Sequence, residues 1–204
     1  MSIIQSTKNP EATQQRILEA AFLEFYKNGF QGGSLNHIVE AAGTTKGALF
    51  HHFDGKQQLG YSVVDQVIGP IMQQRWLAPL EDTTDPVSAL QLAFRTHSKD
   101  DLDSGNWLLG CPLNNLAQEM SPLDEGFHHR INDLYERWRG RIAAALRRGI
   151  EAGTVRKEVG PVKAAALIVS AQMGIWGSGK SSQRKEVMSE AVDAVCDYLE
   201  SLRI

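Results

Sequence analysis

The sequence predicts an all-α protein, with a three-helix unit at the N-terminus (residues 1–56) and a larger helical domain after it (residues 57–204). Two observations support this fold class. Apolar residues recur at the i, i+3, i+4 spacing of amphipathic helices in one segment after another. Proline or glycine stands near the ends of most of these segments. The chain has 204 residues, of which 42% are hydrophobic, so it can bury a substantial core.

A loose N-terminal arm is expected up to Pro10, followed by a first helix over residues 11–28. The inward stripe of this helix consists of Ile17, Ala21 and Phe25. Gly29 is placed to end it, because glycine commonly follows the last turn of a helix. We expect this helix to back the two helices that follow, with Phe30 packing beneath Leu35.

Two short helices are predicted between residues 34 and 53, joined at Gly43. Apolar residues recur at helical spacing in the first of them, at Leu35, Ile38, Val39 and Ala42. Ser34 is placed as its N-cap, and Gly43 can adopt the left-handed conformation that ends a helix. Either Thr44 or Thr45 can cap the second helix, whose inward pair is Leu49 and Phe53. The connection is about three residues long, as in a helix-turn-helix.

The outer face of the second short helix carries small and cationic side chains. If its apolar pair points to the core, a rotation of about 100° per residue turns four residues outward, namely Thr44, Gly47, Ala48 and His51. Lys46 and Phe50 lie at the sides of this face. The two smallest residues allow a close approach to base edges, Lys46 can contact phosphate or guanine, and His51 and His52 can donate hydrogen bonds. This face therefore favours contact with a DNA groove.

The run AAGTTKGALFHHF, followed by Lys56, resembles the DNA-binding signature of the TetR family of bacterial transcriptional regulators, and the resemblance covers residues 11–58. It implies that the second short helix reads the major groove from Thr45, Lys46, Gly47, Ala48, Phe50, His51 and His52. It also implies phosphate contacts from Ser34 and Lys56. The family usually has tyrosine at the position of Phe50, so a phenol hydrogen bond to phosphate is absent here. Ala48 is smaller than the threonine often found at its position.

The resemblance implies a repressor that binds a palindromic operator as a homodimer and is released by a small-molecule effector. It places the dimer interface on the last two predicted helices, residues 161–176 and 184–203, as a four-helix bundle across a two-fold axis. Three alanines are expected to permit close approach there: Ala164, Ala165 and Ala171. A dimer also presents one recognition helix to each half of a palindromic operator.

A connecting helix over residues 57–80 is expected to kink or break at Pro70. The resemblance makes this helix the link between the DNA-binding and effector domains, so a kink there would convert a change in the pocket into movement. Further helices are predicted at residues 86–99, 112–120 and 122–152. The polar residues 100–106 are expected to separate the first two of these.

Candidate effector contacts are aromatic and amide side chains on the inward stripes of these helices, since such groups suit a mostly apolar pocket. They are Phe94, His97, Cys111, Asn115, Tyr135, Trp138, Gln172 and Trp176. For each of them the alternative is ordinary core packing.

Cys111 also suggests an alternative mode of regulation, because it precedes the predicted helix 112–120. The unpaired N–H groups of a helix N-terminus can lower a thiol pKa and so favour the reactive thiolate. Some TetR-like regulators that respond to electrophiles use a cysteine in a comparable place. The competing interpretation is a small, buried and inert packing residue.

The segment GIWGSGKS, residues 174–181, matches the phosphate-binding loop pattern G-x-x-x-x-G-K-S. Such a loop must follow a buried strand and open into a helix of a parallel sheet, whereas a helical pattern precedes it here. Only 23 residues follow Ser181, too few for the remaining strands. We therefore interpret the segment as a helix end followed by a glycine-rich loop, and we expect no enzymatic activity.

Composition argues against several other classes of protein. The net charge is −3, from 21 basic and 24 acidic residues, so DNA binding depends on a few placed cations. No apolar run is long enough to span a bilayer, and the N-terminus lacks the order of a signal peptide, so a cytoplasmic protein is expected. The two cysteines make neither a disulfide framework nor a metal site, and no cofactor is expected.

Overall fold

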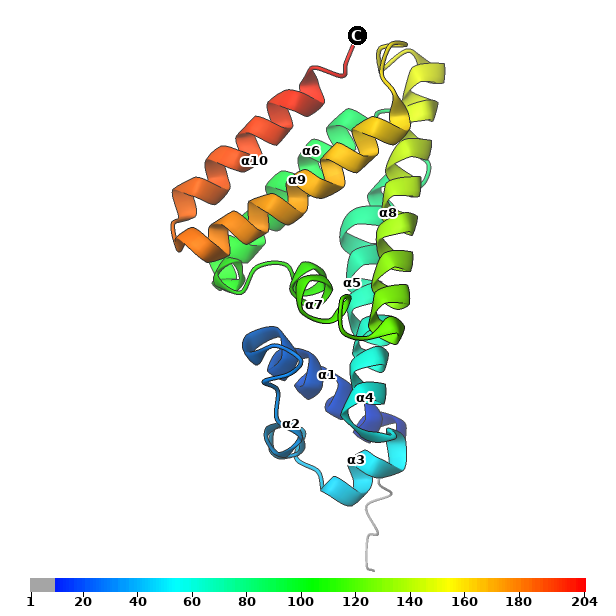
Figure 1. Ribbon diagram of the computed structural model, residues 1–204. Coiled ribbons are helices and arrows are strands. Elements are labelled where there is room, and N and C mark those ends of the chain that lie inside the picture. Colours follow the sequence, from blue (N-terminus) through cyan, green and yellow to red (C-terminus); the bar gives the residue numbers. More distant parts are fainter. Residues whose placement is uncertain (1–9) are drawn as a thin grey trace, which may run out of the picture.

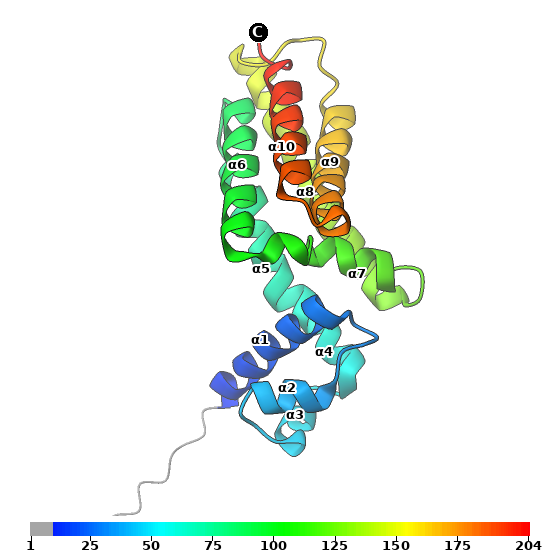
Figure 2. The same ribbon diagram turned by 90° about the vertical axis from the view of Figure 1, so that its left-hand side faces the viewer.

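The computed structural model describes residues 10–204, and over this range the protein is helical, with a single β-bridge between Val155 and Arg203. The prediction of an all-α fold is confirmed. The expected N-terminal arm, residues 1–9, lies outside the described residues. The helices of residues 10–63 gather at one end of the molecule and those of residues 86–104 and 125–200 form the other end, with α7 (Pro112–Met120) between the two groups (Figures 1 and 2). No helix within residues 10–204 is long and apolar enough to cross a membrane.

The helix-turn-helix unit consists of α1 (Pro10–Asn28), α2 (Leu35–Ala41) and α3 (Lys46–His52). Its helix ends follow the predicted residues. Gly29 and Gly43 adopt φ values of 76° and 58°, in the left-handed region that favours glycine. The Ser34 hydroxyl accepts from the backbone N–H of His37, and the Thr45 hydroxyl accepts from that of Ala48 at 3.2 Å. Thr45 is therefore the cap of α3.

The core of this unit is apolar and is supplied by all three helices. Its buried side chains are Ile17, Leu18, Ala21, Phe25, Ile38, Ala42, Leu49 and Phe53. Phe30 packs against Phe25 and against Phe127 of the C-terminal region, with ring centroids 5.1 and 4.8 Å apart. Phe30 therefore lies where the two ends of the molecule meet.

The connecting helix stays helical through Pro70, so the expected break does not occur. It begins with α4 (Gly55–Val63), which continues into the π-helical segment η1 (Val64–Ile68) and then into α5 (Gly69–Met72). A second π-helical segment, η2 (Gln73–Leu77), follows, and the helix ends in the 3₁₀ turn η3 (Ala78–Leu80). Proline has no N–H and its ring crowds the carbonyl of the preceding turn. The wider π turns on both sides accommodate it, and Gly69 N–H bonds to the Val64 carbonyl.

The C-terminal region contains α6 (Pro86–Ser104), the 3₁₀ turn η4 (Asn106–Leu108), α7 (Pro112–Met120), α8 (Glu125–Ala152), α9 (Pro161–Ser182) and α10 (Lys185–Glu200). In Figures 1 and 2, α10 lies beside α6 and α9. Two boundaries differ from prediction. The polar residues 100–104 form the last turns of α6, which ends at Gly105 with φ 80°. Helix α8 begins after its N-cap Asp124, and not at Pro122.

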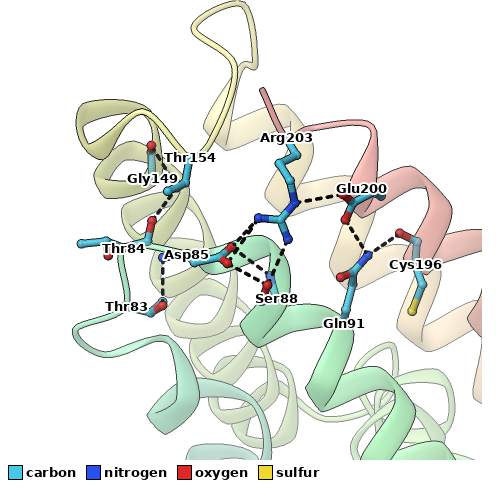
Figure 3. A network of polar contacts seen from close by, with 10 residues as sticks. All are labelled: Thr83, Thr84, Asp85, Ser88, Gln91, Gly149, Thr154, Cys196, Glu200 and Arg203. Carbon is cyan, nitrogen blue, oxygen red and sulfur yellow. Dashed lines mark hydrogen bonds and ion pairs between the residues drawn. The ribbon is translucent and has the colours of Figure 1, made fainter.

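Polar contacts attach the C-terminal end of the chain to the start of α6 (Figure 3). Arg203 donates to both carboxylate oxygens of Asp85 at 3.2 Å, to the Ser88 hydroxyl at 3.0 Å and to Glu200 at 2.9 Å. Asp85 also caps α6 by accepting from the Ser88 backbone N–H. These bonds fix α10 against α6.

Candidate nucleic-acid interface and ligand cavity

The outward surface of α3 has the composition predicted for it. Thr45, Lys46, Gly47 and His51 are exposed, Thr44, Ala48 and His52 are half-buried, and Leu49 and Phe53 are buried beneath them. Phe50 is 52% exposed, which is a large exposed fraction for an aromatic side chain. The sequence of α3 contains no acidic residue. The surface therefore combines small side chains with positive charge and can enter a groove without repelling phosphates.

The two predicted phosphate contacts lie at helix N-termini on either side of α3. Ser34 caps α2, and its backbone N–H donates to Glu24 Oε1 at 2.9 Å. Lys56 lies in the first turn of α4, where its ammonium donates to the Gln31 carbonyl at 3.0 Å and lies 5.1 Å from the centre of the Phe30 ring. In this structure Lys56 therefore points back to the protein.

Glu24 fixes the entry to α2. It accepts from the Ser34 N–H and lies 3.2 Å from Nδ1 of His37. Partial burial raises the pKa of Glu24, but the hydrogen bonds from Ser34 and His37 outweigh it, so the pKa lies below its ordinary value. Glu24 is thus charged at neutral pH and anchors the turn between α1 and α2.

A cavity of about 220 Å³ lies between α1, the connecting helix and the C-terminal region. We call it the central cavity. Most of its lining is aromatic or aliphatic, and the lining residues are Phe22, Leu23, Tyr26, Lys27, Ile68, Ile71, Met72, Arg75, Trp76, Asp101, Asn106, Leu109, Cys111, Pro112, Gln172 and Trp176. A concave, mostly apolar site with a few polar groups is the usual form of a small-molecule site.

The central cavity has one buried carboxylate in its wall, that of Asp101, which is only 7% exposed. Arg75 Nη2 donates to its Oδ1 at 3.1 Å, and the indole N–H of Trp176 donates to its Oδ2 at 2.6 Å. The same nitrogen of Arg75 donates to the His97 carbonyl at 3.1 Å. A buried carboxylate requires such partners, and both of its oxygens are satisfied here.

Gln172 provides the central cavity with an acceptor that has no partner. The residue is 2% exposed, and its Oε1 makes no hydrogen bond within the described residues. Buried acceptors of this kind are uncommon, because leaving one unpaired costs about 1–3 kcal/mol. A ligand that donates a hydrogen bond to Gln172 would remove that cost.

Comparison with known proteins identifies the family to which these features belong. A model of bacterial regulatory proteins of the tetR family matches residues 17–60, and a model of a tetracyclin repressor-like C-terminal domain matches residues 92–195. The protein belongs to the TetR family. The TetR-family match covers α3 with its exposed face, and the C-terminal match covers the part of the central cavity formed by α6, α7 and α9.

Individual relatives agree with this assignment. The HTH-type transcriptional repressor DhaR of Mycobacterium sp. (strain GP1) is 25% identical over 187 residues, which cover 91% of each chain. An uncharacterized HTH-type transcriptional regulator in the lacX 3′ region of Lactococcus lactis subsp. lactis is 30% identical over 139 residues, covering 68% of this chain and 70% of that one. The crystal structure of a TetR-family regulator from Cytophaga hutchinsonii superposes with a TM-score of 0.84 at 19% identity, covering 97% and 98% of the two chains. TetR-family proteins are transcriptional regulators and not enzymes.

Three of the predicted effector contacts line the central cavity of this TetR-family protein: Cys111, Gln172 and Trp176. Phe94, His97 and Trp138 lie behind Trp76, whose ring centroid is 5.1 Å from each of theirs. Phe94 and Trp138 are buried and His97 is half-buried, and all three hold a lining residue in place. His97 also donates through Nε2 to the Arg75 carbonyl at 2.8 Å, and burial lowers its pKa.

The two remaining predicted contacts do not line the central cavity. Tyr135 is buried, and its hydroxyl has no partner within the described residues. Asn115 lies at a neighbouring groove beside α1 and donates to the Leu109 carbonyl at 2.8 Å. It thereby holds the segment that precedes α7.

The wall formed by α1 and the connecting helix was not predicted from the sequence. Its unpredicted polar and aromatic side chains include Tyr26, Lys27, Arg75 and Trp76, and Asp101 of α6 was likewise not predicted. One signal was present in the sequence. Phe22 and Tyr26 extend a second aromatic face of α1, separate from the stripe that packs into the helix-turn-helix core, and their rings stack with centroids 5.6 Å apart.

Cys111 is the N-cap residue of α7, as predicted, but its thiol is not activated. Burial raises the pKa of Cys111, although hydrogen bonds from the backbone of Asn114 and Leu113 and from the Gln172 side chain act in the opposite direction. The lowered pKa that the electrophile-sensing alternative requires is not found, and the competing interpretation of a buried packing residue fits this environment. Desolvation of the thiolate outweighs the helix N-terminus, and the residue packs as a small apolar side chain.

The segment 174–181 is helical throughout, because α9 continues to Ser182. The rejection of a phosphate-binding loop is confirmed, but the expected glycine-rich loop is wrong. Lys180 donates to Asn115 Oδ1 at 3.3 Å, so its ammonium contacts α7. Ala164 and Ala165 are also buried within the protomer, at 5% and 1% exposure, so they do not lie on a surface that a second copy could approach.

Proposed function

We propose that this TetR-family regulator is a repressor that binds a palindromic operator as a homodimer and dissociates from it when a small molecule occupies the central cavity. The observation that carries the proposal is the surface of α3, where exposed Lys46, Gly47 and His51 stand over buried Leu49 and Phe53. The unit 1–56 would supply the DNA contacts and residues 57–204 the effector and dimer contacts. A repressor of this kind works in the cytoplasm, where the chromosome is.

The proposed DNA contacts follow from the geometry of α3 and its neighbours. Thr45, Lys46, Gly47, Ala48, Phe50, His51 and His52 would face the major groove. Ser34 and Lys56 would contact phosphates on either side. For Lys56 this requires the ammonium to leave the Gln31 carbonyl. The exchange replaces a neutral acceptor by a charged phosphate oxygen, and hydrogen bonds between charged groups are stronger.

The proposed dimer interface lies on α9 and α10. The outward surface of α9 supports it, because Val162 and Leu167 are 63% and 50% exposed. A Cβ added at Gly174 or Gly177 would have no neighbour within 4 Å, so the backbone there is open to close approach. These residues replace the buried alanines as the small side chains that a helix from a second copy would meet.

The proposed effector is a compact, largely apolar molecule with a hydrogen-bond donor. The aromatic lining and the volume of the central cavity support the apolar body. The free Oε1 of Gln172 supports the donor. A thiol-reactive effector acting through Cys111 is not favoured, because that thiol is buried and its pKa is raised.

The experiment that tests the proposal is fluorescence anisotropy on duplexes tiled across the DNA that flanks the gene. Nonspecific competitor is included, and salt is varied because phosphate contacts make affinity salt-dependent. We expect saturable binding to one palindromic duplex. Lys46→Ala and His51→Ala should each weaken it roughly tenfold, whereas Lys157→Ala, an exposed lysine remote from α3, should not. Equal affinity of all four proteins would exclude α3 as the DNA-reading surface.

A further inference from the structure

The central cavity has a wall that belongs to the helix-turn-helix unit. Phe22, Leu23, Tyr26 and Lys27 of α1 line it. At about 100° per residue, these four residues occupy the side of α1 opposite to the buried residues Ile17, Leu18, Ala21 and Phe25. Helix α1 therefore packs into the helix-turn-helix core with one face and closes the cavity with the other.

The cavity wall facing α1 includes the short segment that joins η4 to α7. Leu109 and Cys111 of this segment line the cavity, as does Pro112, the first residue of α7. The Tyr26 hydroxyl lies 2.5 Å from the Gly110 carbonyl oxygen and 3.2 Å from the Asn106 carbonyl oxygen, so it joins the two walls by hydrogen bonds. Burial raises the pKa of Tyr26, as does the neighbouring charge of Asp101. The hydroxyl is therefore protonated and can donate at physiological pH.

Further hydrogen bonds connect the ends of the molecule without lining the cavity. Glu119 of α7 accepts from the backbone N–H groups of Phe30 and Gln31, both at 2.8 Å. Asp124, the N-cap of α8, accepts from the Tyr61 hydroxyl at 2.7 Å. These contacts hold the C-terminal end of α1 and the start of the connecting helix. The bond from Tyr26 is the one that a molecule in the cavity can reach.

We propose that the effector acts as a wedge between α1 and the segment 106–112. A molecule in the central cavity contacts α1 directly, separates the Tyr26 hydroxyl from Gly110 and Asn106, and moves α1 together with the helix-turn-helix core packed on its other face. The signal then reaches α3 through α1 itself, in addition to any movement of the connecting helix. This mechanism rests on the proposed function, because it requires that the cavity binds an effector. It also requires that the form in which the Tyr26 hydroxyl contacts Gly110 and Asn106, which we call the latched form, binds DNA.

Filling the cavity with a side chain tests the wedge without any ligand. Leu109→Trp introduces a large ring at a lining position, and Leu108→Trp introduces the same ring at the preceding residue, which is 46% exposed and does not line the cavity. We expect Leu109→Trp to bind the operator roughly tenfold or more weakly than Leu108→Trp, since a population shift of this size is ordinary for allosteric coupling. Equal operator affinity of the two variants, both folded, would overturn the proposal.

A second variant removes the hydrogen bonds of the Tyr26 hydroxyl and leaves the cavity unfilled. Tyr26→Phe removes one hydroxyl and keeps the ring, so the fold should be retained. We expect operator affinity to fall by roughly 2- to 10-fold, the size of a neutral hydrogen bond. Tyr135→Phe is the matched control, because the Tyr135 hydroxyl is buried, has no partner within the described residues and does not line the cavity. A Tyr26→Phe protein that binds the operator as tightly as Tyr135→Phe would contradict a hydrogen bond of this role at Tyr26.

Hydrogen–deuterium exchange separates failure of the wedge from failure of the proposed function. In the absence of DNA, amides of α1 and of residues 106–112 should exchange faster in Leu109→Trp than in Leu108→Trp, because the contacts across the cavity are lost. Unchanged exchange in these segments would overturn the wedge whether or not an operator is found. A wild-type protein that binds no operator would exclude the proposed function, while the exchange comparison would still decide whether filling the cavity releases α1.

Discussion

The indole nitrogen of Trp176 lies 2.6 Å from Oδ2 of Asp101 and is the donor that satisfies one oxygen of a buried carboxylate. Arg75 satisfies the other oxygen at 3.1 Å. The three residues come from three separate elements of the chain: Trp176 from α9, Asp101 from α6 and Arg75 from the connecting helix. One polar cluster therefore holds three elements of the cavity wall together.

The first prediction concerns the indole donor of Trp176. Trp176→Phe leaves Asp101 Oδ2 without its partner, whereas Trp138→Phe removes an indole nitrogen that is buried and unpaired. Both changes lose similar packing. We expect Trp176→Phe to lower the free energy of unfolding by about 1.5–3 kcal/mol more than Trp138→Phe, the usual size of a hydrogen bond to a charged group. Urea denaturation measures the difference. Equal losses of unfolding free energy in the two variants would show that the hydrogen bond from Trp176 to Asp101 makes no net contribution to stability.

The second prediction concerns acid stability. Partial burial raises the pKa of Asp85, but hydrogen bonds from Ser88 and Arg203 lower it below its ordinary value of about 3.9. A carboxyl whose pKa is lower in the folded state stabilises the fold above its unfolded pKa, and this contribution disappears as the pH falls through the folded pKa. We therefore expect the difference in unfolding free energy between wild type and Asp85→Asn to be larger at neutral pH than below about pH 3.

Asp193→Asn is the control for the Asp85 experiment, since Asp193 pairs with Arg95 on an exposed surface and contributes little. Its effect should be small at every pH. A difference between wild type and Asp85→Asn that grows as the pH falls would contradict the sign assigned to the Asp85 pKa.

The third prediction concerns cysteine reactivity. Cys111 is 6% exposed and burial raises its pKa, so little reactive thiolate is present at neutral pH. Alkylation of Cys111 by iodoacetamide should be at least roughly 100-fold slower in the native protein than in urea, because modification requires local opening. Peptide mass spectrometry over time distinguishes Cys111 from Cys196. Comparable rates in the two conditions would restore the electrophile-sensing alternative.

Local signals in the sequence were sufficient for much of the helix-turn-helix unit. The positive φ of Gly43 is predictable because it depends on one residue at a helix end and on its immediate neighbours. The burial of Leu49 and Phe53 is predictable because their spacing alone places them on one side of a short helix. The exposed face of α3 followed from the same geometry.

Errors arose where distant residues decide the local structure. Residues 100–104 remain helical although they are polar, because Asp101 finds its partners in Arg75 and Trp176. The glycine-rich end of α9 remains helical because it packs on the next helix, where a Cβ on Gly179 would lie 3.4 Å from Met188. The wall that α1 contributes to the central cavity is not predictable for the same reason, since Asn106 and Gly110, which Tyr26 contacts across the cavity, lie 80 and 84 residues away in the sequence.

The fourth prediction compares two glycines. A Cβ on Gly60 would lie 2.5 Å from Phe30 and 2.6 Å from Phe127, within the aromatic cluster that joins the two ends of the molecule. Gly60→Ala should therefore destabilise the protein by about 1–3 kcal/mol through overpacking.

A Cβ on Gly140, within α8, would meet nothing within 4 Å. Gly140→Ala should stabilise by about 0.5–1 kcal/mol, because alanine loses less backbone entropy in a helix. Thermal unfolding measures both, and a similar effect at the two sites would contradict the packing described.

The fifth prediction concerns Phe50, where the TetR family usually has tyrosine. Its side chain is 52% exposed beside Lys46 and His51, so an added hydroxyl would reach solvent in the free protein and a phosphate in the complex. Phe50→Tyr should strengthen operator binding by roughly 2- to 10-fold, the value of one hydrogen bond. Stability should not change, because nothing buried is altered.

Phe50→Tyr adds no charge, so the slope of log affinity against log salt should match that of the wild type. A new ionic contact would make this slope steeper. Weaker binding by Phe50→Tyr would mean that the ring contacts an apolar part of the groove, and that Phe50 reads bases instead of facing the backbone.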